Sequence, residues 1–465
     1  MRRHLNETAE TGTSEAVVED PTTMSRRRKP PPHDSFFQME PISFHEDEDE
    51  HRLTFRRSAA FWCLGVLNNA SYVLMISFAK TLNDGGTGII FLVDLLPILL
   101  IKMSAPYWFD SVSYNARISM ASLSTVVAFS ILGTFENYYL RLVGVAFASV
   151  QCGLGEASLL GLAGRLDSQG SATQKGHCLT SFSSGAGFAG VFTFAFKWFC
   201  SDWMGWTMAK TTWIAQVFAL LYWGIYYKVL WKATGISLKS DKIASHPTED
   251  QPLLVEGFSE QRNTHSCGSA APLDTMGGSQ RFQLVLSLWP YMTPLFMIFF
   301  FGYIMAAGVW SGIGLPQVGI PEDRQRFFTY ANWSNQAGDF LSRTSGVFWT
   351  APLPVLWLLP MLQGLHVTWF AYMAVHSQSR LYSGWVLYPN CFLFGSMGGS
   401  IYISAYKRIC QDIPTEYREF SLSAASVADA FGVLVADVFG LFIQSCLYQH
   451  NGIPGAVVTC PIKPK

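Results

Sequence analysis

The feature that most constrains this chain is a series of apolar stretches, each about as long as a lipid bilayer is thick. They begin at residue 59 and recur almost to the C-terminus. An α-helix rises about 1.5 Å per residue, so roughly 20 apolar residues cross a hydrocarbon core of about 30 Å. Backbone polar groups find no water in lipid, which leaves helices or barrel strands, and the lengths favour helices. The sequence therefore predicts an all-α polytopic membrane protein, whose function depends on the few polar groups placed inside the membrane.

The composition agrees with this class. Only 14% of the residues are charged, whereas a soluble protein carries about 25%. The net charge of −1 argues against a nucleic-acid partner. No CxxC pair is present, and six cysteines are interpreted as buried apolar residues rather than as disulfides or metal ligands. These six lie in or beside apolar stretches: Cys63, Cys152, Cys178, Cys200, Cys391 and Cys446.

The apolar stretches fall into two blocks that a long polar segment separates. About eleven transmembrane helices are predicted, and ten and twelve stay open as alternatives. The predicted spans are 59–82, 88–108, 116–134, 138–163, 177–199 and 207–231 in the first block, and 283–314, 325–348, 349–375, 381–406 and 418–447 in the second. The first span of the second block is long enough to contain a kink or a re-entrant turn. Six spans, a long loop and five more are typical of a two-bundle secondary transporter.

This layout divides the chain into five parts. A disordered cytosolic tail precedes a six-helix bundle, a cytosolic loop follows, and a second helix bundle ends in a short tail. The predicted boundaries are 1–58, 59–231, 232–281, 282–450 and 451–465.

Basic residues next to the spans indicate the orientation. Arg52, Arg56 and Arg57 precede the first span, and loops rich in Lys and Arg stay in the cytosol. The N-terminus and the loop after span six, with Lys228 and Lys232, are therefore predicted to be cytosolic. With eleven spans the C-terminus would be lumenal or extracellular.

Polar side chains inside spans one and two are the first candidates for a substrate site. A charge at the bilayer centre costs about 3 kcal/mol or more, so it needs a partner or a water-filled cavity. Asn68 and Asn69 are adjacent on a helix and point in different directions, so one can face a cavity while the other bonds a neighbouring helix. Asp94 is a candidate for proton coupling, or alternatively a structural ion-pair partner. Lys102, eight residues further on, is interpreted as an interfacial residue whose ammonium group extends towards water.

Three further charged residues lie in later spans. Glu156 follows a Gly-Leu-Gly segment and is a candidate for gating or coupling. Arg343 can bind a carboxylate or a phosphodiester with two hydrogen bonds, or it can act as an anchor at the cytosolic interface. Asp429 lies deeper in the last span than the charged residues at the cytosolic entrance of that span, and it is a better functional candidate than they are.

A mixed-charge cluster is predicted at the cytosolic entrance of the last span. It contains Lys407, Arg408, Arg418 and Glu419. These residues are interpreted as a cytoplasmic gate of salt bridges, or alternatively as a solvated helix end.

Several segments together resemble the battenin family, the lysosomal membrane proteins of juvenile Batten disease and their yeast vacuolar relatives. They occur in both blocks, in the order of the family: FWCLGVLNNASYV at 61–73, DLLP at 94–97 with IK at 101–102 and AP at 105–106, FASVQCGLGE at 147–156, SSGAG at 183–187, SRTS at 342–345, and YREF at 417–420 with Asp429.

The resemblance implies a fold similar to the major facilitator and equilibrative nucleoside transporter group. It also implies a lysosomal or vacuolar membrane, a role in lysosomal pH, and export of small catabolites of the glycerophosphodiester or basic amino-acid class. Ser184, in the fourth of these segments, joins the substrate candidates. Gly302 and the pair Ala306-Ala307 depart from the acidic residue and the Asn-Gln pair of many members, so the substrate can differ.

The polar segment between the blocks contains a candidate sorting signal. Glu249 precedes Leu253 and Leu254 at the spacing of an acidic dileucine signal, which clathrin adaptors read on cytosolic segments. The position matches that of battenins and favours the lysosome or vacuole.

Two function classes follow. The first is a transporter for a small anionic or zwitterionic solute, with protons as a further candidate ligand. The second is a non-transporting membrane scaffold that regulates trafficking or proton-pump activity through the polar tail and loop. No enzyme is predicted, because the sequence has no HExxH or GxSxG motif, and no cofactor or metal is predicted.

Overall fold

The computed structural model describes residues 44–82, 87–169, 177–231, 277–456 and 458–461. Every regular element in these ranges is a helix, as the apolar stretches predict. The candidate sorting signal at Glu249, Leu253 and Leu254 lies outside the described residues.

The helices of the first block overlap all the predicted spans, and the largest difference is the earlier start of the first helix. They are α1 (Phe44–Leu82), α2 (Thr87–Trp108), the 3-10 turn η1 (Phe109–Ser111), α3 (Tyr114–Thr134), α4 (Tyr138–Gln169), α5 (His177–Lys197), the π-helical η2 (Trp198–Trp203), α6 (Met208–Ala215), α7 (Val217–Ile225) and the π-helical η3 (Tyr226–Leu230).

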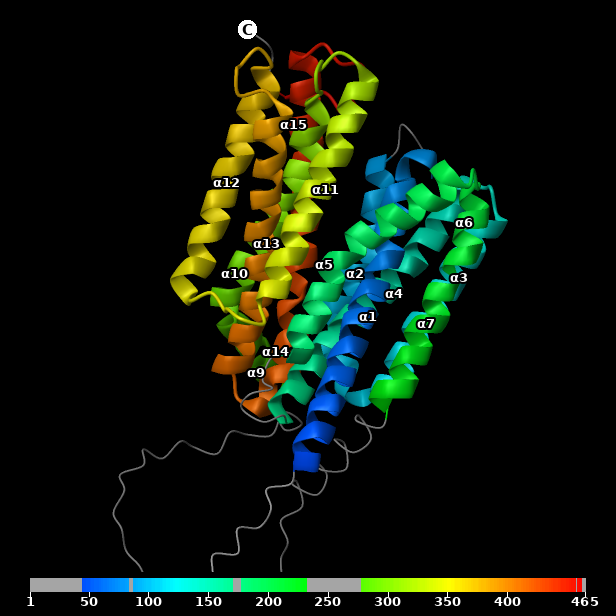
Figure 1. Cartoon of the computed structure of the whole chain (residues 1–465), viewed down its shortest axis with the longest axis vertical. Coiled ribbons are helices and arrows are strands. Elements are labelled where there is room, and N and C mark those ends of the chain that lie inside the picture. The colour runs from blue at the N-terminus through cyan, green and yellow to red at the C-terminus, as the bar shows by residue number, and fades with distance from the viewer. Residues whose placement is uncertain (1–43, 83–86, 170–176, 232–276, 457, 462–465) are drawn as a thin grey trace, which may run out of the picture. The chain divides into compact units, whose positions relative to one another are not determined.

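The second block is also helical at every predicted span. Its elements are α9 (Gly278–Ser287), α10 (Trp289–Tyr303), the π-helical η5 (Ile304–Val309), the 3-10 turn η6 (Trp310–Gly312), α11 (Pro321–Ser345), α12 (Leu353–Val375), α13 (Gly384–Asp412), α14 (Thr415–Ala425) and α15 (Val427–His450). Figure 1 shows α10, α12, α13 and α15 gathered beside α11, with α3, α4 and α7 in a second group.

The helical elements support the predicted fold class more firmly than the predicted number of spans. In the described part of the chain, seven helical stretches combine the length and the apolar composition needed to cross a bilayer. The helices α1, α2, α11 and α13 are not among these seven. The count of eleven therefore stays a prediction.

The start of α1 corrects one boundary. The helix begins at Phe44, so residues 44–58, which were assigned to a disordered tail, are helical. The acidic run 46–50 lies in the first turns of this helix.

Glycines let the helices of the two blocks approach closely. A Cβ atom on Gly185 of α5 would lie 2.0 Å from the carbonyl oxygen of Trp62 in α1, and one on Gly190 would lie 2.5 Å from Gln336 Oε1 in α11. A side chain at Gly185 would clash with the backbone of α1, and one at Gly190 would require the Gln336 side chain to move. Helix α5 thus lies against both α1 and α11, and it brings the polar face of α11 next to the first block.

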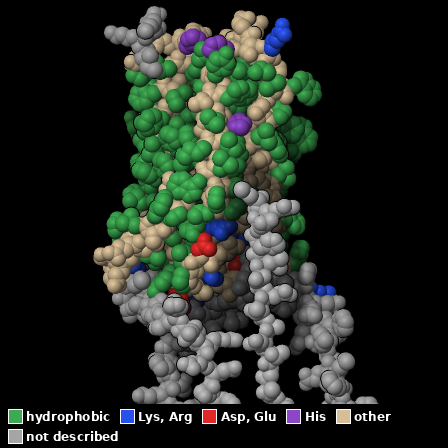
Figure 2. Space-filling view, turned by 90° about the vertical axis from the view of Figure 1, so that its left-hand side faces the viewer, with side chains coloured by type: hydrophobic (Ala, Val, Ile, Leu, Met, Phe, Trp, Pro, Cys, Tyr) green, Lys and Arg blue, Asp and Glu red, His purple; other side chains and the backbone are tan. Residues whose placement is uncertain are grey.

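The two ends of the helix bundle differ in what they carry. We call the end where η3 ends and α9 begins the loop end, and the opposite end, where α15 ends, the tail end. Figure 2 shows one face whose surface between the ends is covered mostly by hydrophobic side chains, while Lys, Arg, Asp and Glu side chains gather towards the loop end. An apolar surface of this extent suits contact with lipid rather than water.

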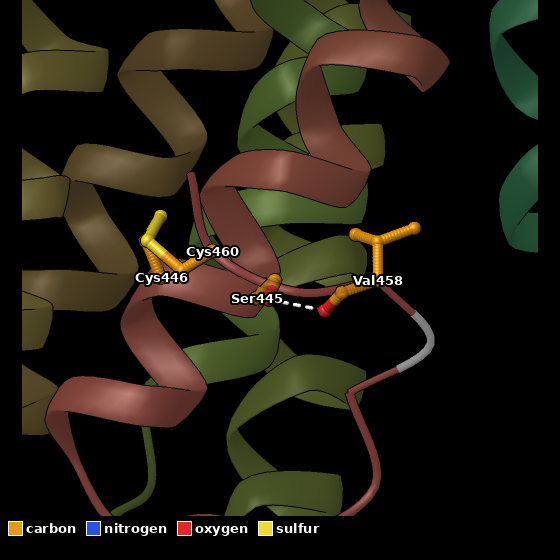
Figure 3. Close-up of a disulfide and its surroundings, with 4 residues drawn as sticks. All are labelled: Ser445, Cys446, Val458 and Cys460. Carbon is orange, nitrogen blue, oxygen red and sulfur yellow. Dashed lines mark hydrogen bonds between the residues drawn. A yellow bond between two sulfur atoms is a disulfide. The ribbon is translucent and has the colours of Figure 1, made fainter. Parts of the chain in front are cut away.

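The tail end holds a disulfide that the sequence interpretation missed. Cys446 of α15 is bonded to Cys460 (Figure 3), so the assignment of Cys446 as a buried apolar cysteine is wrong. The hydroxyl of Ser445 also donates to the carbonyl oxygen of Val458. The chain turns back after His450, and this reversal brings together two cysteines that are 14 residues apart.

Candidate functional site

A buried lysine joins two carboxylates from different helices. Lys102 Nζ of α2 lies 2.8 Å from Glu156 Oε2 of α4 and 2.7 Å from Asp429 Oδ1 of α15. Lys102 is only 2% exposed, so its interpretation as an interfacial residue is wrong. Its aliphatic stem does not carry the ammonium to water, because two carboxylates inside the protein hold it there.

The network continues from Glu156 into α13 and α11. The hydroxyl of Tyr402 donates to Glu156 Oε1 at 2.8 Å. The guanidinium of Arg343 lies over the Tyr402 ring, 3.9 Å from its centroid, and Arg343 Nε pairs with Asp339 Oδ2 at 2.8 Å. We call these six residues the central network; their helices, α2, α4, α11, α13 and α15, come from both blocks of the chain.

Three members of the central network were not predicted as site residues: Lys102, which was interpreted as interfacial, and Asp339 and Tyr402, which were not singled out at all. Asp339 lies four residues before Arg343 on one helix, a spacing that places the two side chains on one face, so this pattern could have revealed it. Tyr402 lies in an apolar span, and no sequence signal distinguishes it from a core tyrosine. The predicted anion site at Arg343 is thus partly occupied by a carboxylate of its own helix.

Asp94 lies apart from the central network, on the same helix as Lys102. It is 2% exposed and accepts a hydrogen bond from the hydroxyl of Ser149 in α4. Asp94 is therefore a second buried acidic position, between α2 and α4.

Asn68 holds three helices of the first block together. Its amide donates to the carbonyl oxygen of Cys152 at 3.3 Å, and its Oδ1 accepts from Gln151 at 3.0 Å and from Tyr222 at 3.3 Å. Gly155 makes room for it, since a Cβ there would lie 1.9 Å from Asn68 Oδ1. These bonds are those of an interhelical contact, one of the two roles that the sequence left open for the asparagine pair.

Asn69 and Ser184 make simpler contacts. Asn69 donates within its own helix, to the carbonyl oxygen of Gly65 at 3.3 Å. The hydroxyl of Ser184 in α5 pairs with that of Thr344 in α11 at 2.8 Å. Ser184 thus connects the two blocks through Thr344, the residue that follows Arg343 in α11.

The four predicted gate residues all lie near the loop end but do not form a single cluster of ion pairs. Glu419 of α14 faces Arg117 of α3 at 3.5 Å and Arg165 of α4 at 3.7 Å. The other three bind uncharged groups: Lys407 donates to Gly346 O, Arg408 to Ala351 O, and Arg418 to Ile413 O and Ser168 Oγ. Gly346 is the C-cap of α11, where carbonyl oxygens lack partners within the helix, and Ala351 lies in the segment before α12. Backbone oxygens thus satisfy Lys407 and Arg408 in place of carboxylates.

Two further observations bear on the predicted chemistry. Within the described ranges, no group of three or more His, Cys, Asp or Glu side chains is arranged to hold a metal ion. A Cβ placed on Gly302 meets no atom within 4 Å, so the position where the sequence resemblance leads one to expect an acidic residue has open space beside it.

Solved structures share the fold at low sequence identity. The proton:xylose symporter XylE aligns with a TM-score of 0.56 at 11% identity, over 88% of this chain and 94% of that chain. The human organic anion transporter MFSD10 aligns with a TM-score of 0.54 at 12% identity, over 86% and 97%. The alignments define the class by its fold: a polytopic helical membrane protein whose helices are arranged similarly to those of the major facilitator transporters.

The family follows from the sequence comparison. The sequence profile of the CLN3 protein family matches residues 59–450, and the chain belongs to this family, the battenins. Protein BTN1 of Yarrowia lipolytica is 27% identical over 407 residues, which are 84% of this chain and 95% of that protein. Protein BTN1 of Saccharomyces cerevisiae is 27% identical over 416 residues, with the same two shares. The resemblance drawn from the sequence segments is confirmed.

Proposed function

We propose that this protein exports small polar catabolites across the lysosomal or vacuolar membrane by alternating access, and that it thereby contributes to lysosomal pH homeostasis. The proposed substrates are anionic or zwitterionic solutes of the glycerophosphodiester or basic amino-acid class, and protons are the proposed coupling ion. The chain is proposed to lie with its loop end in the cytosol and to be sorted by clathrin adaptors that read its dileucine segment.

The central network is the observation that carries this proposal. It holds two cationic and three anionic side chains between helices of both blocks, with Lys102 2% and Asp429 4% exposed. Buried ion pairs contribute little to stability, because desolvation offsets their attraction. Ionisable groups inside a membrane protein are by default candidates for a transport pathway. A network that crosses between the blocks is also able to break and re-form when the blocks move.

The charges of the network suit a solute that carries both signs. Arg343 and Lys102 can bind a phosphate or carboxylate group, and Arg343 does so with the planar donor pattern that these groups match. The carboxylates of Asp339, Glu156 and Asp429 outnumber them, so an ammonium group or a proton would balance the excess. A glycerophosphodiester with a cationic headgroup and a basic amino acid both carry an anionic and a cationic group. The first has no net charge, so the excess carboxylate would still need a proton, whereas the net positive charge of the second balances it.

The disulfide supports the proposed orientation. Disulfides form and persist in oxidising compartments and are rare in the cytosol. The bond between Cys446 and Cys460 lies at the tail end, so this end is proposed to face the lumen. The opposite placement of the loop end agrees with the basic residues before span one and after span six.

The contacts at the loop end suit a state that is closed towards the cytosol. Arg418 of α14 donates to Ser168 of α4 at 2.8 Å, and Glu419 bridges to Arg117 and Arg165 of the first block. Export in the proposed direction requires these contacts to break. Closure at one end with later opening there is the essential step of alternating access.

Transport by purified protein in liposomes is the direct test. Liposomes loaded with glycerophosphocholine or lysine, acidic inside, should release the substrate faster with the protein than without it. Glu156→Gln and Arg343→Ala should abolish this release. Glu322→Gln, a matched control at an exposed position on α11, should not. Wild-type protein that moves neither solute class under any pH gradient would overturn the proposal and favour the scaffold alternative, which deletion of residues 1–43 would then test.

A further inference from the structure

Two arginines near the loop end share one carboxylate. Arg117 lies about one turn inside the start of α3, Arg165 about one turn before the end of α4, and Glu419 about one turn inside α14. All three are therefore at a similar depth below the loop end. The arginines belong to the first block of the chain and the glutamate belongs to the second.

Arg117 is buried and incompletely paired. It is 3% exposed, and its Nε and Nη1 atoms are buried without a hydrogen-bond partner. The guanidinium carbon lies 4.0 Å from the ring centroid of Tyr114 and 4.4 Å from that of Phe109. The aromatic faces stabilise the cation but accept none of its N–H groups in the plane of the guanidinium. A buried guanidinium with unused donors therefore faces the site that Glu419 enters.

Glu419 fits this site loosely. Its oxygens lie 3.5 Å and 3.7 Å from the nearest nitrogens of Arg117 and Arg165, whereas a charge-assisted N–H···O bond is about 2.7–2.9 Å long. The pairs of Lys102 in the same protein reach 2.7 Å and 2.8 Å. Gly161 of α4 leaves space for the glutamate, since a Cβ there would lie 3.0 Å from Glu419 Cγ. A ligand with more oxygens, and with freedom to move closer, could use the Arg117 donors that Glu419 leaves unused.

We propose that Arg117 and Arg165 form a binding site for the phosphate or carboxylate group of a small soluble anion at the loop end. Glu419 occupies this site when the loop end is closed, and an arriving anionic group displaces it. The displacement removes a contact between the two blocks, so binding at this site favours opening of the loop end. This inference deepens the proposed function and rests on it for the passage step, since it makes the site the last one that an exported anion meets. Binding itself does not depend on transport.

The test is equilibrium binding of inorganic phosphate to the full-length protein in nanodiscs of zwitterionic lipid, measured by calorimetry. Glu419→Gln keeps the shape of the side chain and removes the competing charge, so it should tighten phosphate binding about tenfold or more. Arg117→Gln in the Glu419→Gln background should abolish that gain. Glu416→Gln, a control on an exposed face of the same helix, should bind phosphate as the wild type does.

A second variant distinguishes loss of the binding site from misfolding of the double mutant. Arg117→Lys in the Glu419→Gln background keeps the charge but not the planar set of donors, and it should retain only part of the gain. Unchanged phosphate affinity in Glu419→Gln would overturn the inference, as would a gain that survives Arg117→Gln. A further outcome is that Glu419→Gln binds an anionic lipid headgroup more tightly, in nanodiscs that contain anionic lipid, without binding free phosphate more tightly. That result would assign the site to a lipid headgroup and would also overturn the inference. Since no gradient is present, none of these results bears on whether the protein transports.

Discussion

Removal of the ammonium group of Lys102 is the sharpest test of the central network. In Lys102→Met an apolar chain of similar length replaces the lysine, and Glu156 and Asp429 lose the cation that contacts both. Two carboxylate oxygens that had shared one ammonium lie roughly 5 Å apart, and at an effective dielectric constant of about 20 their repulsion is about 3 kcal/mol. Breaking a buried ion pair by removing one partner typically costs about 3–5 kcal/mol. Lys102→Met should therefore be less stable than the wild type by about that amount.

Compensating substitutions separate stability from transport. The triple variant Lys102→Met, Glu156→Gln, Asp429→Asn has no charge at the three positions, and neutral replacement of a buried ionic group is often tolerated without loss of stability. It should therefore recover most of the stability that the single variant loses. It should not recover transport, because the groups proposed to bind solute and proton are gone.

Thermal unfolding of the detergent-solubilised protein, together with the liposome release assay, measures both quantities. The single variant should unfold several degrees below the wild type, and the triple variant should unfold near it. A single variant that unfolds at the wild-type temperature would refute the assigned ion pairs. A triple variant that transports at the wild-type rate would refute the functional role of the network while leaving its structural role intact.

Three further predictions concern other parts of the molecule. Gly190→Val should slow transport more than it reduces expression, because its side chain would displace Gln336 between α5 and α11; Gly224→Val, at a glycine with open space beside it, is the control in the release assay. Asp94→Asn should leave solute binding intact but remove the dependence of release on an acidic lumen, which release rates at several pH gradients would reveal, and an unchanged dependence would exclude Asp94 as the coupling group. In sealed vesicles with the loop end outside, Cys446→Ser should make Cys460 reactive only to thiol reagents that cross the membrane, and labelling by an impermeant reagent would contradict the proposed orientation.

The sequence predicted the class of this protein and the position of its helices, because both depend on local properties. A span needs only enough consecutive apolar residues to satisfy its own backbone inside lipid, and each of those hydrogen bonds lies within the segment. The family segments are likewise contiguous, and the match to residues 59–450 confirms them. Asn68, Asp94, Glu156, Arg343 and Asp429 stood out for the same reason, since a polar residue inside an apolar run is visible without knowledge of its partners.

The pairing of these residues was decided only by the tertiary structure. Lys102 and Asp429 are 327 residues apart, and no pattern in either segment shows that α2 and α15 lie side by side. The observed partners changed the interpretation of individual residues. Lys102 is the centre of the central network, and Asn68 makes an interhelical contact. Lys407 and Arg408 donate to backbone oxygens. The pairing of Arg117 with Glu419 and the disulfide of Cys446 were likewise decided only by the tertiary structure. The energy of a buried charge depends on what lies within a few ångströms of it, and in a helical bundle that neighbourhood is set by packing between segments distant in sequence.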